Sequence, residues 1–177
     1  EDASGTLVSG GSMANIIALT VARNAMADAD IREQGIGGLE KPLRYYTSDQ
    51  VHSCHQIGME LLGLGNSALR RIPSLPDCTI DISLLEKAIA DDRAAGFIPA
   101  CVIGSAGTVN TGAVDDLPAL GDICRRENMW FHVDGCIGAL LAIAPMNKHK
   151  VAGMEAAHSI ALDPHKSLHA PFEVGCV

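Results

Sequence analysis

The sequence predicts an α/β fold with a mostly parallel sheet and helices on both of its faces. Short apolar segments alternate along the whole chain with segments whose apolar residues recur at helical spacing. The short segments are continuously apolar, which is typical of strands that are buried on both faces. No repeat, low-complexity tract or linker interrupts this alternation, and 177 residues suit one unit with a sizeable core.

The strand segments are bounded by turn residues or by a helical segment. The first is short and runs into two glycines, and the last has only begun where the sequence ends. The expected strands are residues 6–11, 43–48, 68–74, 99–108, 129–134, 159–163 and 172–177.

The helical segments combine apolar periodicity with start and stop signals. Ser83 and Glu86 have the spacing of a capping box, and Gly96 is the expected stop of the same helix. Pro118 stands near the start of the next helix, where proline is favoured. The expected helices are residues 12–30, 51–65, 81–96, 117–128 and 136–145.

Charge and cysteine content exclude some classes of protein. The 13 basic and 21 acidic residues give a net charge of −8, which argues against nucleic acid or an anionic membrane as a partner. No apolar run approaches membrane-spanning length. The six cysteines form no CxxC pair, and Cys101, Cys124 and Cys136 lie in apolar segments. This pattern predicts reduced, packed thiols in a cytoplasmic protein.

Chemically capable residues follow several of the predicted strands. In open α/β sheets, ligands bind at the carboxyl ends of the strands. We therefore expect one ligand site at this edge of the sheet. The residues that follow strand ends are Ser12 with its glycines, His52, Thr108, Asp134, His165 and Lys166.

The segment "SGGSMAN" is a candidate anion site. Gly10 and Gly11 leave backbone N–H groups open just before a helix, and Ser12 adds a hydroxyl donor. The positive end of a helix dipole favours a phosphate at such a place. An ordinary helix cap after a turn explains the segment equally well. It matches neither the Walker loop nor the GxGxxG spacing.

Asp134 and Lys166 both follow apolar strands. An unpaired carboxylate is costly to bury, so Asp134 needs a cationic or N–H partner, unless it caps the next helix. A lysine in a partly desolvated pocket has a lowered pKa and can form a Schiff base with an aldehyde. The alternative for Lys166 is an ordinary surface lysine just past a strand.

The segment "DQVHSCHQ" supplies an imidazole. We interpret His52 as a neutral ring that stacks on or hydrogen-bonds a flat ligand. A metal site of His52, Cys54 and His55 matches no zinc spacing, and we expect no metal. His55, one helical turn on, is expected to be a surface histidine.

Taken together, these groups specify a ligand. They offer a turn for an anion, an aspartate for a protonated ring nitrogen, a histidine face and a lysine for an aldehyde. Pyridoxal 5′-phosphate has the matching groups: a phosphate, a ring nitrogen, a flat ring and an aldehyde. Enzymes that use it need a Schiff-base lysine and an acidic partner for the pyridinium nitrogen.

Five segments resemble the pyridoxal-phosphate-dependent group II amino acid decarboxylases, which include the aromatic-L-amino-acid, glutamate and histidine decarboxylases. The match runs in order from near residue 5 to the end, and HVD followed by a PHK lysine is its most specific part. The resemblance implies the large, cofactor-binding domain of the aspartate-aminotransferase-like fold (fold type I). The segments are "SGGSMANIIAL", "TSDQVHSCHQIGMELLGLG", "GSAGTVNTGAVDDL", "WFHVDGCIGALL" and "DPHKSLHAPFEVGCV".

The resemblance also implies a role for each matching residue. Lys166 resembles the lysine that binds the cofactor as a Schiff base. Asp134 resembles the partner of the pyridine nitrogen, and His52 resembles the histidine stacked on the ring face. Gly11 and Ser12 match the phosphate-binding turn.

Other positions match the family's site or depart from it. Thr108 falls in the turn near the cofactor, and His165 matches the histidine beside the lysine. Asp163, on the phosphate side, sits where many relatives have Asn and some have Asp. Cys136 stands where alanine is common and would lie against the cofactor, and Ser167 replaces a bulkier residue.

The resemblance implies decarboxylation of an L-amino acid to its amine and CO2, through a Schiff base on Lys166. The residues of the last segment resemble aromatic-type members and favour aromatic substrates. Local residues leave other pyridoxal-phosphate enzymes open, such as an aminotransferase or a carbon–carbon lyase. A catalytically incomplete fragment that binds the cofactor is a further alternative.

The ends of the sequence suggest a piece of a longer chain, because there is no initiator methionine and the last strand is incomplete. By resemblance, residues 1–177 are part of the large domain, with an N-terminal segment and a C-terminal small domain outside them. We expect the piece to be inactive alone. The resemblance implies a homodimer for the full-length protein.

Overall fold

The computed structural model, which describes residues 3–177, confirms the α/β architecture with a parallel sheet. Glu1 and Asp2, with which the sequence opens, lie outside the described residues. The sheet has five strands in the order β3-β2-β4-β5-β6, and every neighbouring pair is parallel. Its strands are β2 (Leu43–Ser48), β3 (Leu69–Ile72), β4 (Ile98–Ser105), β5 (Trp130–Asp134) and β6 (Ser159–Ala161).

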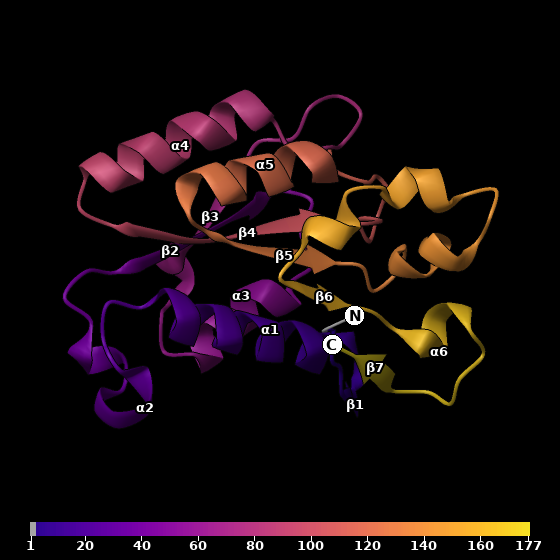
Figure 1. Ribbon diagram of the computed structural model, residues 1–177, viewed down its shortest axis with the longest axis horizontal. Helices are drawn as coiled ribbons and strands as arrows, with labels where there is room; N and C mark the ends of the chain where they lie inside the picture. Colours follow the sequence, from indigo (N-terminus) through magenta and orange to yellow (C-terminus); the bar gives the residue numbers. More distant parts are fainter. Residues whose placement is uncertain (1–2) are drawn as a thin grey trace.

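Helices cover both faces of this sheet, as predicted (Figure 1). α4 (Ile82–Ala94) and α5 (Leu117–Glu127) lie over one face, and α1 (Gly10–Met26) and α3 (Cys54–Leu61) over the other. The predicted helix at 136–145 is a short 3₁₀ turn. The remaining helical segments are α2 (Ile31–Gln34), α6 (Pro164–Ser167), η1 (Ile36–Gly38), η2 (Asn66–Ala68), η3 (Ala139–Ile143), η4 (Lys148–Val151) and η5 (Met154–Ala156).

The strands read as continuously apolar because both of their faces are buried. Tyr46, Val102 and Phe131 belong to the core beneath α4 and α5. Tyr45 and Ile103, one position away from two of these, belong to the core against α1 and α3. Successive side chains of a strand point to opposite faces, so each helical layer needs its own apolar set.

The first and last predicted strands lie outside the parallel sheet. β1 (Leu7–Ser9) and β7 (Val174–Cys176) form a separate antiparallel pair in which Leu7 lies opposite Cys176. Leu7 is 74% exposed, so this pair is not covered on both faces as a central strand would be. The pairing places residues 7–9 beside residues 174–176, which are far apart in the sequence (Figure 1). β7 also approaches the chain so closely that a Cβ on Gly175 would meet the backbone of Gly10.

The predicted capping box at the start of α4 does not form. Asp81 caps the helix instead, since its carboxylate accepts a hydrogen bond from the Leu84 N–H at 3.0 Å. The Ser83 hydroxyl donates to Asp81, and Glu86 pairs with Arg126 on α5. A carboxylate is the stronger acceptor near the positive end of the helix dipole, which explains the preference for Asp81.

The cysteines are thiols, and all six are unbridged. Burial raises the pKa of Cys101, and it raises the pKa of Cys124 to about 12. Both residues therefore stay protonated and serve as small apolar side chains in the core. Among residues 3–177, no helix combines the length and the apolar character needed to cross a membrane.

Asp115 joins the end of β4 to the loop before α4. The side chain is buried, and its two oxygens accept hydrogen bonds from the Ile80 N–H at 2.7 Å and the Ser105 N–H at 2.8 Å. Ser105 ends β4 at the carboxyl edge of the sheet. Asp115 therefore fixes backbone at the edge where the sequence predicts the ligand site.

We expect Asp115→Asn to lower the free energy of unfolding by about 2–4 kcal/mol, because an amide supplies one acceptor oxygen for two buried N–H donors. Urea unfolding of the purified protein measures the change. Asp122→Asn on α5, where the side chain is 70% exposed, is the matched control and should leave the midpoint in place. An unchanged midpoint for Asp115→Asn would contradict this role.

Candidate functional site

A cavity of about 300 Å³ opens at the carboxyl edge of the sheet. It lies where the rule for open α/β sheets predicts a ligand. The structure brings the candidate residues together, because all of them line this cavity. They are Gly11, Ser12, His52, Thr108, Asp134, Cys136, Asp163, His165 and Lys166.

The glycine turn before α1 forms one wall of the cavity. α1 begins at Gly10, earlier than the predicted start at Ser12, and Gly10 has a φ of +80° that favours glycine. A Cβ on Gly11 would overlap the Cys136 sulfur and lie 2.5 Å from an Asp163 carboxylate oxygen. Gly11 is therefore required for the close packing of the turn against two other cavity residues.

Lys166 reaches the cavity from α6, and it forms an ion pair with Asp163. Its Nζ lies 2.7 Å from Asp163 Oδ2, and Asp163 is 2% exposed. Burial would lower the pKa of Lys166, but the hydrogen bond and charge of Asp163 outweigh it, and the pKa is raised. A lowered pKa, expected for a lysine in a partly desolvated pocket, is therefore wrong for Lys166, because the carboxylate of Asp163 reverses the direction.

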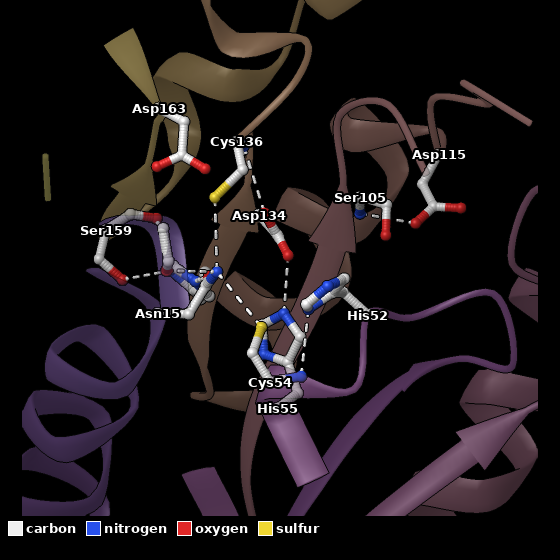
Figure 2. A network of polar contacts seen from close by, with 12 residues as sticks. Asn15, His52, Cys54, His55, Ser105, Asp115, Asp134, Cys136, Ser159 and Asp163 are labelled. Carbon is white, nitrogen blue, oxygen red and sulfur yellow. Dashed lines mark hydrogen bonds and ion pairs between the residues drawn. The ribbon is translucent and has the colours of Figure 1, made fainter. Parts of the chain in front are cut away.

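Asp134 ends β5 and holds two hydrogen bonds at the floor of the cavity (Figure 2). Oδ1 accepts from the Cys136 N–H at 3.2 Å, and Oδ2 is 2.8 Å from His55 Nε2. Burial would raise the pKa of Asp134, but its contacts with His55 lower it. The carboxylate is therefore ionised.

His55 corrects a second prediction, since it is fully buried and not a surface histidine. It lies on the buried face of α3 together with Met59, at the i, i+4 spacing of a helix. The apolar periodicity of this helix could have signalled the burial of His55. The periodicity does not identify Asp134 as its partner.

His52 stands exposed at the rim of the cavity, just before α3. The Cys54 backbone N–H lies 3.1 Å from His52 Nδ1. A backbone N–H donates, so Nδ1 accepts and the ring N–H lies on Nε2. This bond orients the imidazole at the rim of the cavity.

Thr108 and His165 line the cavity, but their polar atoms bond mainly to neighbouring loops. The Thr108 hydroxyl is 2.6 Å from the Thr111 hydroxyl and accepts from the Ala113 N–H. His165 Nδ1 donates to the Val174 carbonyl at 2.8 Å, and its ring packs edge-on against Phe172. Both residues hold the loops that border the cavity.

A chain of buried hydrogen bonds behind the cavity was not predicted. The indole of Trp130 donates to the Ser159 hydroxyl, which lies 2.9 Å from His132 Nδ1. His132 Nε2 is 2.8 Å from the side-chain oxygen Oδ1 of Asn15, and the side-chain amide of Asn15 donates to the Gly11 backbone carbonyl. These bonds tie the turn before α1 to β5 and β6. Alternation along "WFHVD" could have found His132, because it shares a side of the strand with Asp134.

Within the described part of the chain, three side chains that could hold a metal ion lie together. They are not the His52, Cys54 and His55 of the sequence motif. Ligand atoms of Cys54, His55 and Asp134 lie within 4.8 Å of one another, whereas His52 is not part of this group. The contact between His55 and Asp134 is a hydrogen bond.

Cys136, at the cavity wall, is a different cysteine from the one in this group. Burial and nearby carboxylates raise the pKa of Cys136, which keeps its sulfur a thiol.

Comparison with known families matches the chain over its whole length. The family model described as "Pyridoxal-dependent decarboxylase conserved domain" matches residues 1–177. The aromatic-L-amino-acid decarboxylase of Bacillus atrophaeus is 41% identical over 177 residues, which are 100% of this chain and 35% of that protein. The glutamate decarboxylase of Drosophila melanogaster is 35% identical over 165 residues, covering 93% of this chain and 32% of that protein.

A solved structure has the same fold. The crystal structure of mouse CSAD superimposes with a TM-score of 0.94 at 32% identity, covering 98% of this chain and 36% of that chain. Mouse cysteine sulfinic acid decarboxylase is 33% identical over 166 residues. The chain thus spans about a third of the length of the curated relatives it matches, 35% in the bacterial and 32% in the fly protein.

Proposed function

Because this chain belongs to the pyridoxal-dependent decarboxylase family, we propose that its cavity holds pyridoxal 5′-phosphate in an enzyme that removes CO2 from an L-amino acid. The observation that carries this proposal is the cavity itself, which joins Lys166, Asp134 and the glycine turn. When bound, pyridoxal phosphate supplies an aldehyde that binds amines and a cationic ring that accepts electrons.

The turn before α1 would hold the phosphate. α1 is a helix of 17 residues with no acidic residue in its first turn, so its positive end favours an anion. Gly11 lets the turn pack closely against Cys136 and Asp163, and Ser12 adds a hydroxyl at the cavity wall. These features fit the phosphate group.

Asp134 and His52 would hold the ring. The ionised carboxylate of Asp134 can accept a hydrogen bond from a protonated ring nitrogen and stabilise its charge. The imidazole of His52, oriented at the cavity rim by the Cys54 N–H, can lie against a flat ring. Cys136 would pack beside the ring as a thiol.

Lys166 would bind the cofactor covalently through its Nζ. Asp163 lies 2.7 Å from this amine and raises its pKa, so the lysine must lose a proton before it can act as a nucleophile. Asp163 Oδ1 is buried without a hydrogen-bond partner among the described residues. Asp163 Oδ2 lies against both Lys166 Nζ and Gly11, so we assign Asp163 to the placement of Lys166 beside the turn before α1.

Decarboxylation is favoured over transamination or carbon–carbon cleavage by the family, since the groups at the cavity would serve all three. An aromatic substrate is favoured by the 41% identity to the aromatic-L-amino-acid decarboxylase, although glutamate and cysteine sulfinic acid decarboxylases are also similar. Four points stay predictions. They are the homodimer, the cytoplasmic location, the membership of residues 1–177 in a larger cofactor-binding domain, and the inactivity of these residues alone.

The test is release of CO2 by the full-length protein loaded with pyridoxal phosphate, across a panel of aromatic, acidic and sulfinic amino acids. We expect CO2 and the matching amine, fastest with an aromatic substrate. Formation of a keto acid without CO2 would assign transamination instead and overturn the proposal. Rapid CO2 release from an acidic substrate alone would overturn the aromatic preference.

We expect Gly11→Ala to weaken binding of pyridoxal phosphate by about 10-fold or more, because the added Cβ pushes Cys136 and Asp163 out of place. Titration of the cofactor, followed by absorbance, gives the dissociation constant. Gly37→Ala is the matched control, since a Cβ there meets nothing within 4 Å. Equal affinity for Gly11→Ala and the control would rule out the phosphate role of this turn.

A further inference from the structure

His55 and Asp134 form a buried pair at the floor of the cavity (Figure 2). His55 Nε2 lies 2.8 Å from Asp134 Oδ2. The His55 side chain is 0% exposed, and that of Asp134 is 14% exposed. Asp134 thus presents one side to the cavity, and His55 supports it from the core.

The hydrogen bond between His55 and Asp134 favours the charged form of each side chain. Burial opposes a charge on His55, but the hydrogen bond to Asp134, the nearby Cys54 sulfur and the charge of Asp134 raise its pKa to about 10. His132 is the other titratable ring near the pair, with its centroid 6.3 Å from that of His55. Burial and the charge of His55 lower the pKa of His132 to about 4, so His132 is neutral.

The surrounding bonds leave His55 as the side chain that orients Asp134. His132 is engaged with Asn15 and Ser159, and the second donor to Asp134 is the backbone N–H of Cys136. His55 Nδ1 has no hydrogen-bond partner among residues 3–177. Within the described residues, the His55 ring therefore makes its hydrogen bond to Asp134, through Nε2.

We propose that His55 is a positioning residue for Asp134, whose carboxylate it directs at the cavity through the hydrogen bond from Nε2. The consequence for cofactor binding rests on the proposed function, whereas the state of the pair does not. The first turn of α3 then has two tasks. It follows His52 at the cavity rim and carries His55 beneath the carboxylate.

Substitutions at His55 separate positioning from simple packing. Leucine fills the buried space but donates no hydrogen bond, so the pKa of the buried carboxylate rises. Glutamine is neutral and keeps an N–H donor. We expect His55→Leu to weaken binding of pyridoxal phosphate by about 10-fold or more and His55→Gln to stay within about 3-fold of the parent protein. His149→Gln, at an exposed position in η4, is the control.

The first measurement uses the cofactor-free, full-length protein with ¹⁵N-labelled histidine rings. We expect the His55 signal, identified by its loss in His55→Gln, to show a proton on Nε2 at pH 7 and the pKa of the ring to fall in Asp134→Asn. A His55 ring without a proton on Nε2 at pH 7 in the parent protein would overturn the proposal, because such a ring cannot donate to Asp134. This result does not depend on cofactor binding.

The second measurement is the cofactor titration, with thermal melting beside it. Affinity lost in His55→Leu and restored in His55→Gln supports positioning. Unchanged affinity in His55→Leu, or equal loss in both variants, overturns it. Should His55→Leu not fold, the ring spectrum and His55→Gln still decide. A parent protein that binds no pyridoxal phosphate would instead refute the proposed function, while the ring spectrum would judge His55 separately.

Discussion

Lys166→Ala is expected to abolish covalent attachment of pyridoxal phosphate and to lower decarboxylation by about three orders of magnitude or more. Lys166 is the amine that the cavity offers to an aldehyde, held at 2.7 Å from Asp163 at the end of α6. Removing it takes away the covalent link and leaves phosphate and ring contacts alone. Absorbance of the bound cofactor and CO2 release by the full-length protein measure the two effects.

Lys166→Arg is the sharper variant. Arginine keeps the positive charge and can keep the ion pair with Asp163, but it stays protonated and cannot attack an aldehyde. The fold and the melting temperature should therefore survive while attachment is lost. Lys150→Ala, at an exposed lysine of η4, controls for loss of a lysine charge. Covalent attachment that persists in Lys166→Arg would assign the link to another amine.

Asp134→Asn is expected to retain covalent attachment at Lys166 and to lose decarboxylation by about 100-fold to 1,000-fold. Asparagine has nearly the same shape but no charge to stabilise a protonated ring nitrogen. It also removes the anion that supports the charge of His55, so the pKa of His55 should fall. The rate of CO2 release and the absorbance of the bound cofactor are measured on one preparation. Asp134→Asn should keep the absorbance of attached cofactor, whereas Lys166→Ala should lose it.

Asp122→Asn, on the exposed side of α5, is the matched control for Asp134→Asn. Its activity and cofactor spectrum should equal those of the parent protein. Full turnover by Asp134→Asn would refute the role of this carboxylate. Loss of cofactor attachment together with turnover would show that Asp134 is needed to build the site before it serves the reaction.

Much of the site could be predicted because its residues follow strand ends. A parallel sheet brings the carboxyl ends of its strands to one edge, so Asp134 after β5 and Lys166 after β6 meet without any knowledge of distances. The glycine turn is a different case. It follows β1, which lies outside this sheet, and it reaches the cavity because α1 packs against β5 and β6.

The unpredicted features depend on which partner a side chain meets. Helical periodicity can indicate that His55 is buried, but not that it faces a carboxylate from β5. The raised pKa of Lys166 has a local signal, because Asp163 stands three residues earlier, a spacing at which helical side chains meet. The hydrogen-bond chain through His132 has no such signal, since its members lie far apart in the sequence.

The pairing of β1 with β7 governs when the site can assemble during folding. Leu7 opposes Cys176, so the glycine turn and the segment after Lys166 are held together by contacts between opposite ends of the chain. Closing so long a loop carries an entropic cost that local contacts do not, and such pairings form slowly. During synthesis, the chain must emerge as far as Cys176 before these walls of the cavity can join. Capture of the cofactor would therefore mark a late stage of folding, after the central sheet has formed.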